Sequence, residues 1–333
     1  MSRISRRTVL SAGLSAGFAN SVFTSWPALA QQQPDWAKGQ TIKLVSPFPP
    51  GGSVDAISRL MQVGLQQRLA TTVIVENRAG AGGAVGANSV AKSAPDGTNI
   101  LVVFDSHAVL PSLMKLQYDS KADLDPVMLI GTAPMVLACH PSRPFKSLKD
   151  VIDASKAKPD SLSFGTVGNG SLGHLLMVLL SKKAGFEIKH LPYRGGGPAV
   201  NDAVGGHIDL IIGSAALLAA QIEAGTLRPL MQSGATRAPT LKDVPTIAES
   251  GFAGSEAYAW WGVFVRAGTP APIKDRIYAD LKASLEDPAI RPKLESGQQV
   301  KLELSPAKPF ADFFDTQMKI WGDVVRDNGI KPD

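Results

Sequence analysis

Small residues and hydrogen-bond donors follow a short apolar run near the start of the chain, in Leu44–Leu60 (LVSPFPPGGSVDAISRL). The apolar start predicts a buried strand, the prolines and glycines force a turn, and Ser53 or Asp55 caps a helix. Such a helix start presents unpaired backbone N–H groups and the positive end of the helix dipole. It therefore favours a small anion such as a carboxylate or a phosphate. The alternative for this single loop is an ordinary strand-to-helix turn.

Three further strand-to-helix junctions share this chemistry. They combine glycines, which let a ligand approach the backbone, with hydroxyl or N–H donors. In open α/β sheets, ligands bind beyond the carboxyl ends of the strands, where all of these loops fall. We therefore expect the loops to converge on one cleft. They are residues 78–83 (RAGAGG), 165–171 (GTVGNGS) and 193–199 (YRGGGPA).

The second of these loops also has two enzymatic interpretations. Its glycines match the dinucleotide fingerprint G-x-G-x-x-G, but the acid expected about 20 residues further on is missing. Ser171 and the glycine two residues on resemble half of a nucleophile elbow, although no histidine with a partner acid stands in the required order. A secreted α/β enzyme acting on a small organic acid, with Ser171 or His174 as the reactive group, is therefore the alternative to binding alone.

Phosphate-loop and metal motifs are missing from the sequence. Residues 50–53 (PGGS) lack the lysine of a nucleotide-binding P-loop. The five histidines, at positions 107, 140, 174, 190 and 207, have no metal-ligand spacing. Cys139 is the single cysteine, so neither an internal disulfide nor a thiolate metal cluster can form. We expect no cofactor and no metal.

The first thirty residues direct export. Three arginines among the first seven residues precede an acid-free apolar run over 9–23, and the motif ALA at 28–30 offers small residues at a cleavage site. Residues 1–30 are therefore predicted to be an export signal that is cleaved after about Ala30. The paired arginines resemble a twin-arginine signal, with an ordinary Sec signal as the alternative. In a Gram-negative host the mature protein would be periplasmic.

Removal of the signal changes the charge balance. The whole chain has 34 Lys+Arg and 29 Asp+Glu, a net charge of +5, but without the three signal arginines 31 basic residues face 29 acidic ones, a net charge of +2. No run of Lys/Arg and no mixture of basic and aromatic residues remains, which argues against nucleic-acid binding. No remaining apolar run approaches the ~18 residues that span a bilayer, so a soluble mature protein is expected.

Strand and helix patterns alternate along the mature chain. This alternation predicts an α/β protein with parallel sheets whose faces are covered. The mature length exceeds the size at which one core usually keeps growing, and no low-complexity linker separates domains in series, so two lobes should be joined within ordered structure. Strand-like runs are 42–45, 73–76, 100–104, 127–130, 136–139, 162–165, 188–191, 210–212, 227–232, 262–266 and 300–304; helical patterns include 55–69, 83–92, 148–156, 172–184, 198–205, 215–224, 272–286, 289–296 and 306–328.

Several motifs of this chain appear in the order of one known family. They are PFPPGGSVD (47–55), ENRAGAGG (76–83), APDG (94–97), FGT (164–166), GS (170–171), HL (174–175), PYRG (192–195), PA (198–199), DVPT (243–246) and AGTP (267–270). In these motifs the chain resembles the substrate-binding proteins of the tripartite tricarboxylate transporter family, also called the Bug or TctC group. The resemblance covers essentially the whole mature chain.

The resemblance implies a two-lobed, type II-like periplasmic-binding-protein fold that binds without catalysis. Each lobe would hold a mixed, mostly parallel sheet flanked by helices, with residues 34–133 plus 256–333 as lobe one and 134–255 as lobe two. The lobes would close on a small carboxylate, a di- or tricarboxylate or an aromatic acid. The implied partners are membrane transporter subunits or a sensor domain, and the protein itself would be a monomer.

The resemblance also places ligand contacts on both lobes. Gly213 stands where many relatives carry an acid or amide that could bind a ligand ammonium, which favours a carboxylate without an amine. Trp260 and Trp261, near the return crossing, would either stack on an aromatic acid or serve packing. The expected contacts are Phe48, Gly52, Ser53 and Asp55, a wall of Ser106 and His107, and, from lobe two, Thr166, Asn169, Gly170, Ser171, Tyr193 and Arg194.

Overall fold

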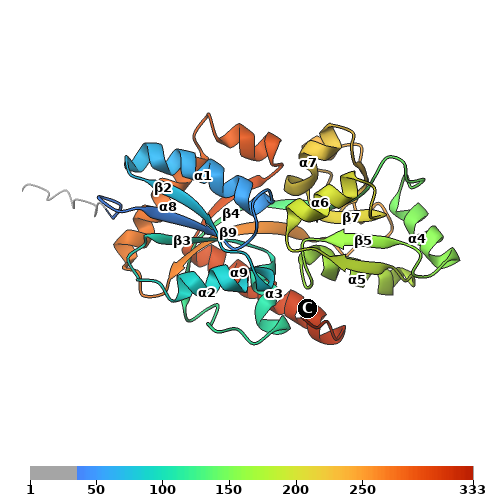
Figure 1. Ribbon diagram of the computed structural model, residues 1–333, viewed down its shortest axis with the longest axis horizontal. Helices are drawn as coiled ribbons and strands as arrows, with labels where there is room; N and C mark the ends of the chain where they lie inside the picture. The colour runs from blue at the N-terminus through green and yellow to red at the C-terminus, as the bar shows by residue number, and fades with distance from the viewer. Residues whose placement is uncertain (1–35, 333) are drawn as a thin grey trace, which may run out of the picture. The chain divides into compact units, whose positions relative to one another are not determined.

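The computed structural model describes residues 36–332, and the chain from residue 34 onward forms one compact unit (Figure 1). The predicted export signal and its cleavage site lie outside the described residues. Strands and helices alternate along the described chain, which confirms the predicted α/β class. No helix in this part of the chain is long and apolar enough to cross a membrane.

One group of strands forms a mixed first sheet. In their order across it, the strands are β2 (Val73–Asn77), β1 (Ile42–Ser46), β3 (Asn99–Phe104), β9 (Tyr258–Arg266), β4 (Leu124–Cys139) and β10 (Lys301–Pro306). β1 runs parallel to β2 and β3, whereas β9 is antiparallel to β3 and β4, and β10 is antiparallel to β4.

A second group of strands continues from the far end of β4. These strands are β7 (Leu210–Ser214), β5 (Ser163–Thr166), β6 (Lys189–Pro192) and β8 (Arg228–Gln232). β5 is parallel to β6 and β7, and β4 is antiparallel to β7 and β8. Antiparallel pairing of the long crossing strands therefore makes both sheets more mixed than the predicted, mostly parallel arrangement.

β4 passes from the first sheet to the second without a break. Two separate strands, 127–130 and 136–139, are predicted here from the sequence. In the structure Pro134 still pairs with Tyr258 of β9, and Met135 already pairs with Ser214 of β7. The crossing therefore lies beside residue 134, where the predicted boundary between the lobes falls; the division itself stays a prediction.

Helices flank both sheets. Around the first sheet lie α1, α2, α3, α8 and α9, and around the second lie α4 to α7 (Figure 1). Their bounds are α1 (Ser53–Leu69), α2 (Ala84–Ala91), α3 (Ser106–Leu113), α4 (Leu148–Ala157), α5 (Leu172–Ala184), α6 (Gly196–Val204), α7 (Ala215–Glu223), α8 (Ala271–Leu285) and α9 (Ala307–Asp327), with short turns at Ala81–Gly83, Pro239–Leu241 and Lys293–Gly297.

Two helical assignments differ from the sequence analysis. The helix predicted over 289–296 is reduced to a single π-type turn, Lys293–Gly297. Conversely, α3 carries an internal proline, Pro111, and no helix is predicted there from the sequence. α3 nevertheless forms because its apolar residues are buried against neighbouring elements, including α9.

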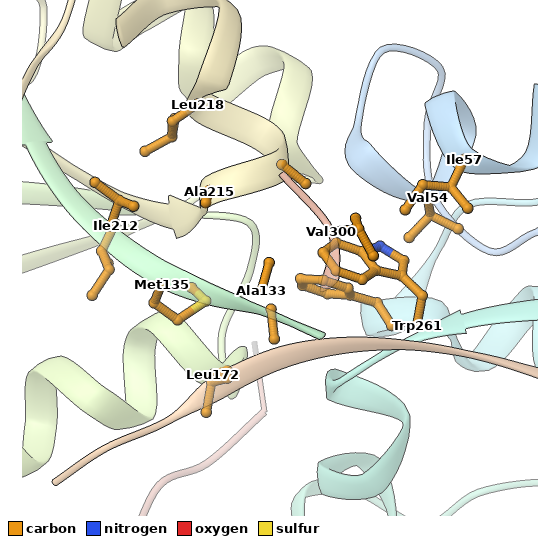
Figure 2. Packing of buried hydrophobic residues seen from close by; sticks show 14 of the residues in the cluster. Val54, Ile57, Ala133, Met135, Leu172, Ile212, Ala215, Leu218, Trp261 and Val300 are labelled. Atoms are coloured by element: carbon orange, nitrogen blue, oxygen red, sulfur yellow. The ribbon is translucent and has the colours of Figure 1, made fainter. Parts of the chain in front are cut away.

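The two tryptophans of β9 belong to the core. Trp261 is fully buried, and its ring lies 5.4 Å from that of Phe104. Figure 2 shows Trp261 near Val54 of α1 and Ala133 of β4, within one apolar cluster that continues to Met135. Trp260 is also fully buried and packs against phenylalanines of α9. Burial in this way favours the packing role over direct stacking on a ligand.

Candidate functional site

Two cavities meet between the strand-to-helix loops, because Phe48 and Val167 line both of them. The smaller has a volume of about 20 Å³, room for one water-sized group, and the larger about 480 Å³. The remaining lining residues of the smaller are Gly52, Ser53, Val54, Phe104, Gly196, Ser214 and Leu217. Those of the larger are Pro47, Pro49, Ala79–Gly83, Leu110, Leu113, Met114, Gly168, Asn169, Tyr193, Arg194, Gly195 and Pro332.

The start of α1 opens into the smaller cavity. Gly52 is the N-cap residue and supplies no side chain, so the first backbone N–H groups of α1 are not capped by one. Ser53 is 8% exposed, and its hydroxyl makes no hydrogen bond to the described residues. This combination leaves a hydroxyl and N–H donors available to an anion.

The start of α6 faces that of α1 across the same cavity. A Cβ atom added at Gly52 would lie 3.9 Å from the backbone nitrogen of Gly196, at the start of α6. Ser214 lies nearby as the N-cap of α7, where its hydroxyl accepts a hydrogen bond from the Leu217 N–H at 3.2 Å. Gly196 and Ser214 are absent from the predicted contacts, although glycine or serine before a helical pattern is a sequence signal for such a position.

Asp55 holds the first loop in place. Its Oδ2 accepts hydrogen bonds from the Gly51 N–H at 3.1 Å and from Arg59 Nε at 3.0 Å, and its Oδ1 accepts from Arg59 Nη2 and Asn77 Nδ2, both at 3.0 Å. Asn77 also donates to the Phe48 carbonyl at 3.0 Å. Burial alone would raise the pKa of Asp55, but these hydrogen bonds lower it overall. The carboxylate is therefore occupied within the protein and does not line either cavity.

The loop after β5 satisfies its own polar groups. The hydroxyls of Thr166 and Ser171 donate to the Gly168 carbonyl at 3.0 and 2.7 Å, and Thr166 Oγ1 lies 2.8 Å from His190 Nε2. The Gly170 N–H donates to His174 Nδ1 at 3.1 Å. None of these three predicted contacts, Thr166, Gly170 and Ser171, lines either cavity, so they shape the loop in this structure.

The start of α5 meets a carboxyl group of the chain itself. Asp105, at the end of β3, is buried, and burial raises its pKa well above the ordinary value. The nearby backbone N–H groups of Leu172, in α5, and of Ser106 offset this only in part, and neither carboxylate oxygen of Asp105 has a hydrogen-bond partner of good geometry. The N-terminus of α5 therefore lies near a buried carboxyl group of the chain, whereas those of α1 and α6 line the smaller cavity.

Asn169, Tyr193 and Arg194, three of the predicted contact residues, line the larger cavity. Asn169 Nδ2 donates to the Lys331 carbonyl at 2.6 Å, and the Tyr193 hydroxyl donates to Asp202 at 2.6 Å. Burial and Asp202 raise the pKa of Tyr193 to about 12. Arg194 is exposed and has no ion pair within residues 36–332. It therefore offers this cavity an unpaired positive charge.

Ser106 and His107, which were predicted to form a wall of the ligand site, line neither cavity. Ser106 donates to the Gly82 carbonyl at 3.3 Å and ties α3 to the glycine-rich loop. His107 points into an aromatic cluster, with ring centroids 5.2 Å from Phe264 and 5.5 Å from Phe314, and burial lowers its pKa to about 4. The wall is instead formed by the apolar end of α3, Leu110, Leu113 and Met114, which the sequence analysis does not single out.

Within residues 36–332, no three His, Cys, Asp or Glu side chains gather as potential metal ligands. Cys139 is buried, and burial raises the pKa of its thiol.

A stacked histidine pair supports the loop after β5 and predicts acid sensitivity. The rings of His174 and His190 lie 3.9 Å apart, and burial together with His174 lowers the pKa of His190 to about 3. Because this pKa lies below the unfolded value of ~6.5, the unfolded chain binds the proton first. Stability should fall by about 1 kcal/mol per pH unit between roughly pH 6 and 3 through this group alone.

Urea unfolding at several pH values measures this slope. We expect His190→Gln to show a shallower loss of stability on acidification than the wild type. His140→Gln, just after β4 and outside the stacked pair, should keep the wild-type slope. Parallel slopes for the wild type and His190→Gln would contradict this role of His190.

Comparison with known proteins identifies the family of this chain. Residues 57–330 match the model of the tripartite tricarboxylate transporter family receptor. Protein BugT of Bordetella pertussis is 34% identical over 300 residues, covering 89% of this chain and 92% of BugT. The periplasmic binding protein BugD is 30% identical with a TM-score of 0.82, over 88% of this chain and 99% of BugD. R. palustris Rpa4515, solved with adipate, is 29% identical with a TM-score of 0.85, over 89% of this chain and all of Rpa4515. The chain belongs to the tripartite tricarboxylate transporter receptor family, a family of periplasmic solute-binding proteins.

Proposed function

We propose that the protein captures a small carboxylate between two lobes and delivers it to the membrane subunits of a tripartite transporter or to a sensor domain. The lobes would be residues 34–133 plus 256–333 and residues 134–255. The observation that carries the proposal is the pair of helix starts, at Ser53 and Gly196, that face each other across the smaller cavity. Two helix N-termini that converge on one point favour a negatively charged group there.

The larger cavity would hold the body of the ligand. Phe48, Leu113 and Met114 give it apolar walls, and Arg194 adds one positive charge. Neither cavity is lined by Asp or Glu, so a ligand ammonium would find no carboxylate partner. We therefore propose a carboxylate without an amine, with an apolar or aromatic body and room for a second acidic group at Arg194. The adipate bound by Rpa4515 has this chemistry.

Closure of the lobes would bury the ligand. Contacts that join the proposed lobes at the cavity include Leu113 against Gly170, Pro49 against Gly195, and the Asn169 amide on the Lys331 carbonyl. Because a ligand touches both lobes only when they are closed, binding shifts the equilibrium toward the closed state. The closed surface is then what a transporter or sensor recognises. We propose that the receptor acts as a monomer.

The arrangement of Ser171 and His174 supports binding without catalysis. The Ser171 hydroxyl donates to the Gly168 carbonyl, and His174 Nδ1 accepts from the Gly170 N–H, so this hydroxyl and this ring nitrogen are not hydrogen-bonded to each other.

We also propose that residues 1–30 are an export signal, of the twin-arginine or Sec type, cleaved after about Ala30. N-terminal sequencing of the periplasmic protein tests the cleavage, and mass spectrometry of a recovered ligand before and after incubation tests for turnover.

Titration calorimetry with adipate and benzoate tests the site. We expect Ser53→Ala to weaken binding of the better ligand by about 1–3 kcal/mol, because the hydroxyl donates to a charged carboxylate. Ser58→Ala, less than two turns further along α1, is the matched control, since the Ser58 hydroxyl is buried without a partner away from both cavities. Equal affinities for Ser53→Ala and Ser58→Ala would remove Ser53 from the site.

A further inference from the structure

A short C-terminal segment, residues 329–332, follows the end of α9 (Figure 1). Gly329 has φ of +59°, and its N–H donates to the Arg326 carbonyl at 3.2 Å, while the Ile330 N–H donates to the Val325 carbonyl at 3.1 Å. These two hydrogen bonds form a Schellman motif, which ends a helix and fixes the path of the chain that follows. The direction of the segment is therefore set by α9.

This segment reaches the loop after β5, which belongs to the other proposed lobe. Ile330 packs against the hydrophobic core, so the first half of the segment is anchored. Beyond it, the Lys331 carbonyl accepts a hydrogen bond from Asn169 Nδ2 at 2.6 Å, and Pro332 lines the larger cavity together with Asn169. α9 also contacts α5, the helix that follows this loop. The end of lobe one is thus joined to a cavity wall that lobe two supplies.

The polar side chains of the loop after β5 differ in where they donate. The hydroxyls of Thr166 and Ser171 donate within lobe two, to the Gly168 carbonyl. By contrast, the Asn169 amide donates across to the Lys331 carbonyl of lobe one. A hydrogen bond between the lobes exists only while they lie close together, so it stabilises the closed state and not the open one.

We propose that residues 329–332 form a strap that holds the ligand site closed, and that Asn169 is a positioning residue that binds this strap and not the ligand. The inference rests on the proposed function. Pro332 forms part of the wall of the larger cavity, and the hydrogen bond between Asn169 and Lys331 breaks when the lobes separate. The strap therefore slows release of the bound carboxylate, since weakened contacts at an interface act mainly on the dissociation rate.

Surface plasmon resonance with adipate and benzoate, on protein attached through its N-terminal end, measures release. Asn169→Ala keeps the charge of the chain and should speed release of the better ligand about two- to tenfold, the effect of one neutral hydrogen bond. A shortened chain that ends at Ile330 keeps the Schellman motif but loses the Lys331 carbonyl and Pro332. It should release the ligand at least as fast as Asn169→Ala does.

Asn201→Ala is the matched control. Asn201 is an exposed asparagine of α6 in the same proposed lobe, and it lines neither cavity. This variant should release the ligand at the wild-type rate. Circular dichroism of each variant checks that it is folded, and measurement at about 0.5 M salt screens the new terminal carboxylate of the shortened chain.

A double-mutant cycle separates binding of the strap from contact with the ligand. In the shortened chain Asn169 has no Lys331 carbonyl to bind, so Asn169→Ala should have no further effect on release. If Asn169 donated to the ligand instead, Asn169→Ala would speed release by the same factor in the full and the shortened chain. That result would overturn the strap.

Failure of the strap and failure of the proposed function give different results. A wild-type protein that binds neither adipate nor benzoate would contradict the proposed function, and the strap with it. A wild-type protein that binds one of them, but releases it as fast as Asn169→Ala and the shortened chain do, would overturn the strap alone.

Discussion

Gly170→Ala is expected to weaken carboxylate binding about 5- to 150-fold while the protein still folds. A Cβ atom at this position would lie 2.0 Å from Leu113 Cδ1, far inside contact distance. Leu113 is on α3 and Gly170 on the loop after β5, so in the proposed mechanism the overlap arises only when the lobes close. Overpacking of this kind costs about 1–3 kcal/mol. Here it would destabilise the closed state and leave the open state unaffected. Calorimetric titration of the wild type and the variant with the same carboxylate measures the change.

Two controls separate the steric clash from backbone strain. Gly170 has φ of +68°, where alanine is strained in every state of the protein. Gly185 has φ of +65° with nothing within 4 Å of an added Cβ, so Gly185→Ala should cost about 1 kcal/mol of stability and leave affinity unchanged. Leu113→Ala should remove most of the penalty of Gly170→Ala in a double-mutant cycle. A cycle with no coupling would show that these two residues do not meet in the bound state.

The local parts of the fold and site were accessible from the sequence. The first loop follows from a short apolar run, prolines and glycines, and a helical spacing after Ser53, all of which act between near neighbours. Tyr193 and Arg194 likewise stand just after a strand, where the sequence predicts ligand contacts, and both line the larger cavity. These predictions needed no knowledge of which elements pack together.

Assignments that depend on distant partners were not accessible. Gly131 looks like a strand breaker, yet β4 continues through it, because β10 crosses so closely that a Cβ there would lie 2.4 Å from the Lys301 carbonyl oxygen. His107 follows a strand as a contact residue would, but aromatic residues from β9 and α9 enclose it. The hydroxyls of Thr166 and Ser171 resemble ligand donors in the sequence, and only the folded loop shows that the Gly168 carbonyl already accepts from both. The residue type shows that a side chain can donate a hydrogen bond to a ligand, whereas only the tertiary structure shows whether that donor is already used within the protein.

Asp55→Ala should lower the free energy of unfolding by about 2–4 kcal/mol and weaken ligand binding as a consequence. The carboxylate accepts four hydrogen bonds that join the first loop, α1 and β2, and its removal leaves the Gly51 N–H and the Asn77 amide without this partner. Losing a buried, hydrogen-bonded charge costs this much even though Arg59 is half exposed. Urea denaturation followed by circular dichroism, together with calorimetric titration, measures both effects.

The pH dependence of Asp55→Asn distinguishes this supporting role from ligand contact. Because the pKa of Asp55 is lowered in the folded protein, its ionised form contributes stability that is fully present above the unfolded pKa of ~3.9. That contribution is lost as the pH falls through the lower, folded value. The stability difference between the wild type and Asp55→Asn should therefore be constant from pH 7 to about 5 and shrink below about pH 4. If Asp55 only contacted the ligand, Asp55→Asn would leave the free energy of unfolding of the ligand-free protein unchanged. It would alter only the selectivity between ligands with and without an amine. That result would contradict the structural role of Asp55.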